Sequence, residues 1–215
     1  AGLPPQALTH AMGMSEATAK IVTEPIDRHP GRFLDVDADA YENHIVRIVE
    51  RDAPNSRTIA SCGATVLDTR CEIVDPDTLE ALGDRRVGEL WVRGTTVAQG
   101  YWGQPEASAA TFCAKLANGE GPFLRTGDFA FRHEGEIYLS GRLKDLIILR
   151  GQNHHPHDLE WPCADSHPAI RPSGAVAFGL EDRGGEQLVV LAEVYPDRLD
   201  NPDEGFTALR AALGD

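Results

Sequence analysis

The sequence predicts a mixed α/β protein of the α+β type, with a strand-rich first part and a smaller second part. Short runs with strand character recur at even intervals in the middle of the chain, separated by glycine- and proline-containing turns. Pro105, followed by a glutamate, marks the start of a helix. A second helix is expected after Pro202, where Phe206, Leu209 and Leu213 recur at intervals of three and four. Together these patterns predict a small barrel or sandwich of strands, accompanied by helices.

The composition limits the class of protein and its partners. The chain has 215 residues, of which 41% are hydrophobic and 25% charged, as in an ordinary globular protein of one or two domains. Its formal net charge of -14 argues against a nucleic acid or an anionic membrane as partner, because both need basic patches. No apolar run approaches the roughly 20 residues that span a bilayer.

Four cysteines stand far apart without a C-x-x-C pair: Cys62, Cys71, Cys113 and Cys163. They are typical of reduced thiols in a cytoplasmic protein, not of a disulfide or zinc framework. The chain begins with AGLPPQAL, without an initiator methionine. We therefore expect a fragment or a processed product.

The middle of the chain predicts a series of short strands. The expected strands, in order, are Ile45–Val49, Thr58–Ser61 before Gly63, Cys71–Val74 and Glu89–Val92. A helix is expected from Gln104 to about Leu116, before the Asn118-Gly119 pair. Tyr101 and Trp102, just before it, are interpreted as packing residues.

The stretch Leu124–Gly151 combines a hairpin, charged residues and an apolar run. Its two strands meet at Glu134-Gly135, and this places Asp128 in the loop that enters one strand and Arg142 just past its partner. A hairpin brings such positions to the same end of its ladder. The pair can therefore bind a sugar, because a carboxylate accepts two hydroxyls and a guanidinium donates to oxygens. A simple Asp–Arg salt bridge is the alternative, and spacing alone favours it.

The residues after the hairpin predict a hinge and a buried strand. Gly141–Lys144 is polar and contains glycine, which suits a hinge, and Leu146–Leu149 is an apolar run that Gly151 ends.

The cluster Met12–Thr18 places a glycine beside Ser15, Glu16 and Thr18. Such a loop can hold a phosphate and its Mg²⁺, since Mg²⁺ takes one or two carboxylates together with substrate phosphates. A capping box or a solvated turn is the alternative.

Three histidines, His154, His155 and His157, invite a metal-site interpretation. A loop leading into a helix is preferred, because Pro156 interrupts the histidines and no matching ligands are near. Pro162 then predicts a short or kinked helix. Beyond it, Ala175–Phe178 and Leu188–Val194 are expected to form a hairpin across Asp182–Gly185.

Taken together, these segments resemble the adenylate-forming (AMP-binding) superfamily, and within it most closely the fatty acyl-AMP ligases. The blocks that carry the resemblance are MGMSEAT (12–18), IASCG (59–63), EIVDPDT (72–78), VGELWVRGTTVAQGYW (87–102), LRTGDFAF (124–131), SGRLKDLIILRGQNHHPHDLE (140–160) and SHPAIRPSGAVAF (166–178). They occur in family order over nearly the whole chain.

The resemblance implies a role for each matching residue. Glu16 matches the glutamate that holds the Mg²⁺ of ATP, and Ser15 the hydroxyl residue beside the α-phosphate. Met14 is expected among the nucleotide-binding residues. Asp128 matches the aspartate that holds the ribose hydroxyls, and Arg142 the arginine that contacts the same ribose.

The resemblance also implies a domain organisation. Residues 1–142 would form the C-terminal part of the large AMP-binding domain, with its small strand-rich barrel. Residues 143–215 would form part of the small mobile C-terminal domain. Lys144 falls at the hinge about which that small domain rotates between half-reactions.

The activity that the resemblance implies is ATP-dependent activation of a fatty acid to acyl-AMP, with transfer of the acyl group to an acyl carrier protein. Three alternatives stay open: an acyl-CoA ligase with coenzyme A as acceptor, an amino-acid-adenylating domain, and a non-catalytic remnant that acts as a binding module.

The chain also departs from the family pattern. The upstream phosphate loop is absent, and the catalytic lysine near the family's C-terminus is expected beyond Asp215, so the isolated chain is expected to be inactive. Met12 stands where the family usually has an aromatic residue that stacks on adenine. Pro162 interrupts a helix that the family usually continues.

Overall fold

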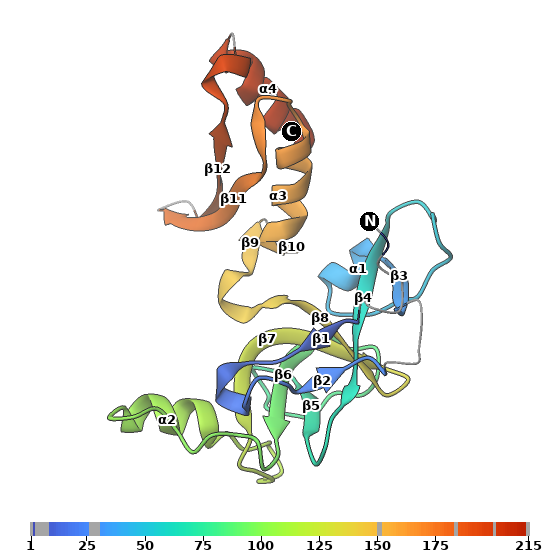
Figure 1. Ribbon diagram of the computed structural model, residues 1–215, viewed down its shortest axis with the longest axis vertical. Coiled ribbons are helices and arrows are strands. Elements are labelled where there is room, and N and C mark those ends of the chain that lie inside the picture. Colours follow the sequence, from blue (N-terminus) through green and yellow to red (C-terminus); the bar gives the residue numbers. More distant parts are fainter. Residues whose placement is uncertain are drawn as a thin grey trace. The chain divides into compact units, whose positions relative to one another are not determined.

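The computed structural model describes residues 2, 9–25, 31–149, 152–182, 185–199 and 201–213. The chain forms two compact units, Ala1–Leu143 and Lys144–Asp215. In Figure 1 the first unit runs from blue to yellow and the second from yellow to red. The expected domain division lay between residues 142 and 143. That the two units are parts of a large and a small adenylating domain stays a prediction.

The first unit is built on one eight-stranded antiparallel sheet. The strand order is β1-β2-β4-β8-β7-β6-β5, and β3 pairs with β4. The strands are β1 Ala11–Met12, β2 Val22–Thr23, β3 Phe33–Asp37, β4 Ser56–Thr65, β5 Arg70–Val74, β6 Gly88–Arg93, β7 Leu124–His133 and β8 Glu136–Arg142. Its helices are the 3-10 turn η2 Ser15–Ala17, α1 Ala38–Glu42 and α2 Pro105–Phe112. The sheet is curled, and the predicted mixed α+β fold is confirmed.

The core of the first unit joins the sheet to the turn that follows β1. The larger buried cluster includes Met12, Ala17 and Ile21 beside strand residues such as Leu90 and Leu124. Full burial of a large apolar side chain stabilises the folded state by about 1.5–3 kcal/mol. The segment around Ser15 and Glu16 is thus anchored from both sides by buried neighbours.

The β7–β8 hairpin forms at the predicted turn. Glu134 and Gly135 have positive φ angles of 48° and 79°. This is the backbone that a two-residue type I′ turn requires. Two details of the prediction are wrong. β7 begins at Leu124, so Asp128 lies within the strand and not in a loop before it, and β8 includes Arg142, which was expected just past that strand.

The predicted strand Ile45–Val49 is wrong. The structure has two isolated bridges there, one between Ile45 and Arg86 and one between Val36 and Ile48. The backbone amides of this segment donate to separate partners: Val46 N–H to Arg85 and Val49 N–H to Asp35. The alternating pattern therefore marks contacts with two different neighbours and not one ladder.

Two further boundaries differ from the prediction. Strand β4 continues through Gly63, where its register with β8 shifts. Helix α2 ends at Phe112 and not near Leu116, because Ala114 leaves the helix to form a bridge with Phe123.

Replacement of Gly63 by alanine is expected to destabilise the first unit. Gly63 has a φ of 90°, and a Cβ atom there would lie 2.1 Å from the backbone of Thr23. The backbone strain and the overlap each cost about 1–3 kcal/mol. We expect urea unfolding to show a loss of at least about 2 kcal/mol. Gly83→Ala is the control, since a Cβ atom at Gly83 meets nothing within 4 Å. Equal stability of the two variants would contradict this account.

The described residues of the second unit form two antiparallel strand pairs, two α-helices and a 3-10 helix. Its elements are β9 Ile147–Leu149, β10 Gln152–His154, α3 Pro156–Asp165, β11 Ile170–Asp182, β12 Gly185–Val194, the 3-10 helix η4 Pro196–Arg198 and α4 Pro202–Leu213. The 3-10 helix η3, Leu143–Asp145, lies at the junction of the two units. β9 pairs with β10, and β11 with β12. Gly151 and residues 183–184 of the expected turn lie outside the described residues.

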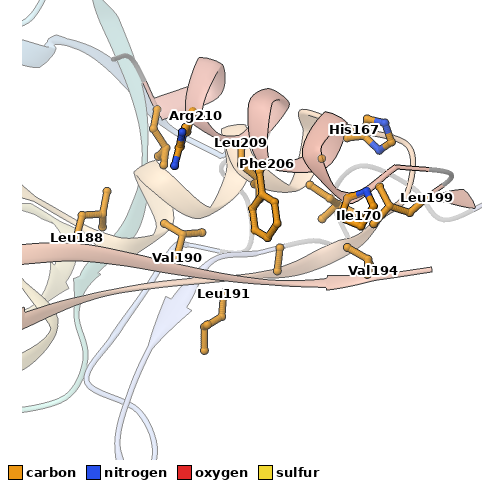
Figure 2. Close-up of a pocket in the computed structure, with 14 residues that line it drawn as sticks. His167, Ile170, Leu188, Val190, Leu191, Val194, Leu199, Phe206, Leu209 and Arg210 are labelled. Carbon is orange, nitrogen blue, oxygen red and sulfur yellow. The ribbon is translucent and has the colours of Figure 1, made fainter. Parts of the chain in front are cut away.

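Helix α4 turns the predicted apolar stripe towards strand β12. Figure 2 shows Phe206 and Leu209 on the side of the strands that carries Val190, whereas Leu191 points to the opposite side. Together with Leu213 these side chains line a largely apolar pocket of about 600 Å³.

Helix α3 begins at Pro156, as predicted, and contains Pro162 within its ten residues. The rings of His155 and His157 stack with their centroids 5.7 Å apart. In the part of the chain that the structure describes, no group of three or more His, Cys, Asp or Glu side chains could hold a metal ion. No helix among the described residues is long and apolar enough to cross a membrane.

Candidate functional site

The turn between β1 and β2 carries three of the predicted site residues. Backbone N–H groups of Ala17 and Ala19 both donate to the carbonyl of Met14, at 3.1 and 3.0 Å. Gly13 permits this closure, since a Cβ atom there would lie 1.3 Å from the Ala19 carbonyl oxygen. Met14 packs against the core, while Ser15 is exposed and Glu16 half-buried. The turn therefore presents a hydroxyl and a carboxylate to solvent.

Glu16 is fixed by the segment that follows β6. The Tyr101 hydroxyl donates to Glu16 Oε1 at 2.8 Å, and the Ala98 N–H donates to the Glu16 carbonyl at 2.8 Å. The hydrogen bond that Tyr101 donates to the Glu16 carboxylate raises the pKa of the Tyr101 phenol. The Tyr101 ring also packs edge-on against Phe112.

The two aromatic residues before α2 were both interpreted as packing residues. For Tyr101 this is correct but incomplete, because 85 residues separate it from Glu16 and the sequence pattern does not indicate that contact. For Trp102 it is wrong, since its side chain is 100% exposed.

The turn suits Mg²⁺ only in company with phosphates. It offers the single carboxylate of Glu16, beside the hydroxyl of Ser15. Mg²⁺ in nucleotide sites characteristically takes one or two carboxylates and completes its shell with phosphate oxygens and water. The residues present therefore fit a nucleotide-bound Mg²⁺ better than an ion held by the protein alone.

On the prediction that Glu16 holds the Mg²⁺ of ATP, Tyr101→Phe is expected to weaken Mg²⁺ binding at this turn. The change removes one hydroxyl and with it the hydrogen bond that orients Glu16. Loss of such an outer partner typically costs about 10–100-fold in metal affinity. We expect the Mg²⁺ concentration that half-saturates ATP binding to rise by about tenfold, the lower end of this range, because Tyr101 is partly exposed. Trp102→Phe is the control, and an equal effect of both variants would contradict the orienting role.

Asp128 and Arg142 meet at the end of the β7–β8 ladder, as predicted. They are paired in register, and Arg142 Nε donates to Asp128 Oδ1 at 3.1 Å. The Asp128 side chain is 14% exposed and that of Arg142 67%. The Asp128 N–H donates to Thr126 Oγ1 at 3.1 Å. The ion pair is common to both interpretations of these residues, the salt bridge and the sugar-binding pair.

Lys144 lies in η3 at the start of the second unit, with an exposed side chain. The predicted hinge segment, Gly141–Lys144, is divided between two elements: Gly141 and Arg142 end β8, whereas Leu143 and Lys144 lie in η3.

Comparison with known proteins assigns the family. The family described as AMP-binding enzyme matches residues 1–102. The chain is 39% identical over 196 residues to the medium-chain-fatty-acid–[acyl-carrier-protein] ligase JamA of Moorena producens, and the match covers 90% of this chain and 33% of JamA. It is 33% identical over 226 residues to the long-chain-fatty-acid–AMP ligase FadD32 of Mycolicibacterium smegmatis, over 91% of this chain and 36% of FadD32.

Solved structures agree with this assignment. The fatty acid AMP ligase of Legionella pneumophila matches with a TM-score of 0.65 and 31% identity, over 99% of this chain and 37% of that chain. A fatty acyl-adenylate ligase of L. pneumophila in complex with acyl adenylate and pyrophosphate matches with a TM-score of 0.65 and 32% identity, over 99% and 37% of the two chains.

The chain belongs to the AMP-binding, adenylate-forming enzyme family. Within that family, its relatives include proteins named fatty acid–AMP ligases, as the sequence resemblance implies. The chain spans about a third of the length of the curated relatives that it matches.

Proposed function

We propose that this chain is part of a cytoplasmic fatty acyl-AMP ligase, and that it supplies the ribose-binding and metal-binding side of the nucleotide site. The observation that carries the proposal is the Asp128–Arg142 pair at the end of the β7–β8 ladder. It combines a carboxylate that accepts two hydroxyls with an exposed guanidinium that donates to oxygens. Relatives named for fatty acids and AMP support the substrate class. Four free cysteines agree with a cytoplasmic location.

The proposed reaction has two steps. A carboxylate oxygen of the fatty acid bonds to the α-phosphorus of ATP, and the bond to pyrophosphate breaks to give acyl-AMP. A thiol then attacks the acyl carbonyl, forms a thioester and releases AMP. JamA is named as a ligase of an acyl carrier protein, which makes the thiol of such a carrier the proposed acceptor. We propose that the thioester product serves lipid or polyketide synthesis.

Each site residue has a proposed part in the first step. Asp128 accepts the two ribose hydroxyls, and Arg142 donates to the same ribose. Glu16 holds the metal, and Ser15 lies beside the α-phosphate, on the turn that Met14 anchors. When bound, Mg²⁺ supplies positive charge against the phosphates, which otherwise repel the incoming carboxylate.

The test of this function uses the complete protein encoded by the reading frame that contains these residues. Incubation with ATP and fatty acids is expected to release pyrophosphate and form acyl-AMP. Supply of a carrier protein and of coenzyme A in separate reactions then identifies the acceptor. Amino-acid-dependent pyrophosphate release, or none with any carboxylate, would contradict the proposal.

Lys144→Pro is expected to separate the two half-reactions in that protein. Lys144 is the proposed hinge residue, and proline there fixes φ near −65° and removes a backbone donor. We expect acyl-AMP to accumulate while thioester formation falls by at least about tenfold. The control is Lys144→Ala. Lys115→Pro would not be a matched control, although Lys115 is also exposed, because Lys115 lies outside the hinge. Full thioester formation by Lys144→Pro would exclude the hinge role.

A further inference from the structure

A buried carboxylate on β6 contacts the segment that leads to Asp128. Glu89 is 1% exposed, although its side chain carries a charge. Arg125 donates to Glu89 Oε2 from Nε at 2.9 Å and from Nη2 at 2.6 Å, and Trp91 Nε1 donates to the same oxygen at 2.9 Å. The Arg125 guanidinium also lies over the Trp91 ring, 5.5 Å from its centroid. The negative charge of Glu89 is thus compensated by the Arg125 guanidinium, and the neutral indole N–H of Trp91 adds a further hydrogen bond.

The other Glu89 oxygen holds the residue directly before Asp128. The Gly127 N–H donates to Glu89 Oε1 at 3.2 Å. Gly127 has a φ of 72°, a backbone conformation that glycine adopts without steric cost. The backbone direction at Asp128 therefore depends on a turn that Glu89 stabilises.

This turn is a bulge in the β6–β7 ladder. Glu89 pairs with Phe129 and Trp91 with Arg125, so that three residues of β7, including Asp128, lie opposite Leu90 alone. A bulge redirects a side chain and is frequent beside functional sites. The Thr126 hydroxyl donates to the Leu90 carbonyl at 2.7 Å. Contacts of the Glu89 side chain of β6 and the Thr126 side chain of β7 hence replace the regular ladder beside Asp128.

We infer that Glu89 is a positioning residue for the nucleotide: it holds the bulge that directs the Asp128 carboxylate toward the ribose hydroxyls. The inference rests on the proposed function of Asp128. A buried ion pair contributes little net stability compared with well-packed apolar residues. The Glu89 carboxylate instead contacts both Arg125 and Gly127, which lie on either side of Thr126 and immediately before Asp128.

The test compares two ligands that differ only in the ribose hydroxyls, AMP and 2′,3′-dideoxy-AMP. Both are titrated into the ¹⁵N-labelled chain, whose spectrum reports folding at the same time. Glu89→Gln keeps the shape but replaces one acceptor oxygen with a donor, so either the Gly127 bond or the two short Arg125 bonds to Oε2 are lost. We expect the affinity for AMP to fall by about tenfold or more and the affinity for 2′,3′-dideoxy-AMP to stay unchanged.

A second variant and a matched control accompany it. Arg125→Lys keeps the charge but loses the fork, at a side chain that is 34% exposed, and should change the ratio of affinities in the same direction. Glu136→Gln makes the same chemical change at a carboxylate that is 4% exposed, at the turn end of the β7–β8 hairpin. It should leave the ratio unchanged.

The outcomes separate the inference from the proposed function. Equal binding of both ligands by the unaltered chain, or no binding, would contradict the ribose site and the inference with it. If Glu89→Gln and Arg125→Lys still bind AMP more tightly than 2′,3′-dideoxy-AMP by the original ratio, the inference is overturned and the ribose site is not. A proportional loss of both affinities would assign Glu89 a purely structural role and also overturn it.

Discussion

Asp128→Ala abolishes the binding of AMP to this chain while the fold stays intact: this is the largest effect that we expect. Asp128 is proposed to accept two ribose hydroxyls, and each hydrogen bond to a charged group contributes about 1.5–3 kcal/mol. Their loss corresponds to at least about a hundredfold in affinity. Titration of the variant by calorimetry or NMR measures it.

A matched control separates this role from that of a salt bridge. Arg132 Nε donates to Asp84 Oδ1 at 3.0 Å, in a geometry close to that of the pair formed by Arg142 and Asp128. Both pairs are partly exposed, and such pairs contribute about 0–1 kcal/mol to stability. Asp84→Ala should therefore resemble Asp128→Ala in stability but retain AMP binding. Unchanged AMP affinity in Asp128→Ala would leave Asp128 as a salt-bridge partner only.

Glu16→Gln is expected to remove the dependence of ATP binding on Mg²⁺. The Glu16 carboxylate is proposed to supply the protein's negative charge at the metal, and an amide oxygen is a weaker ligand for this hard cation. Because loss of an outer partner alone costs about 10–100-fold in metal affinity, loss of the ligand should cost more than about a hundredfold. ATP titrations over a range of Mg²⁺ concentrations measure the effect.

The same variant carries its own control. AMP binding through Asp128 should persist in Glu16→Gln. AMP lacks the β- and γ-phosphates, whose negative charge Mg²⁺ would chiefly compensate. The pKa of Tyr101 should fall towards its ordinary value, since its raised pKa arises first from the hydrogen bond to Glu16. An unaltered Mg²⁺ dependence would exclude Glu16 as the metal-binding residue.

The sequence predicts those parts of the structure that local chemistry controls. Glu134-Gly135 adopts the positive φ angles of a type I′ turn, and this turn, together with a register shift between Phe129 and Ala130, pairs Asp128 with Arg142. Pro105 begins α2 and Pro202 begins α4, because a helix tolerates proline in its first turn.

Contacts between distant segments were not predictable from one sequence. Ile45–Val49 alternates like a strand but contacts two separate neighbours. The bond between Tyr101 and Glu16 and the bond between Glu89 and Gly127 join residues 85 and 38 positions apart. A short pattern indicates that a residue is polar or apolar, but it does not specify which distant partner it meets.

The most direct test of the account is a chemical-shift map of AMP binding to the ¹⁵N-labelled chain. The account predicts that the largest changes fall on the amides of Gly127, Asp128 and Arg142, where β7 and β8 pair beside the bulge. Changes confined to the apolar pocket beside α4, lined by Val190 and Phe206 among others, or no changes at all, would contradict it.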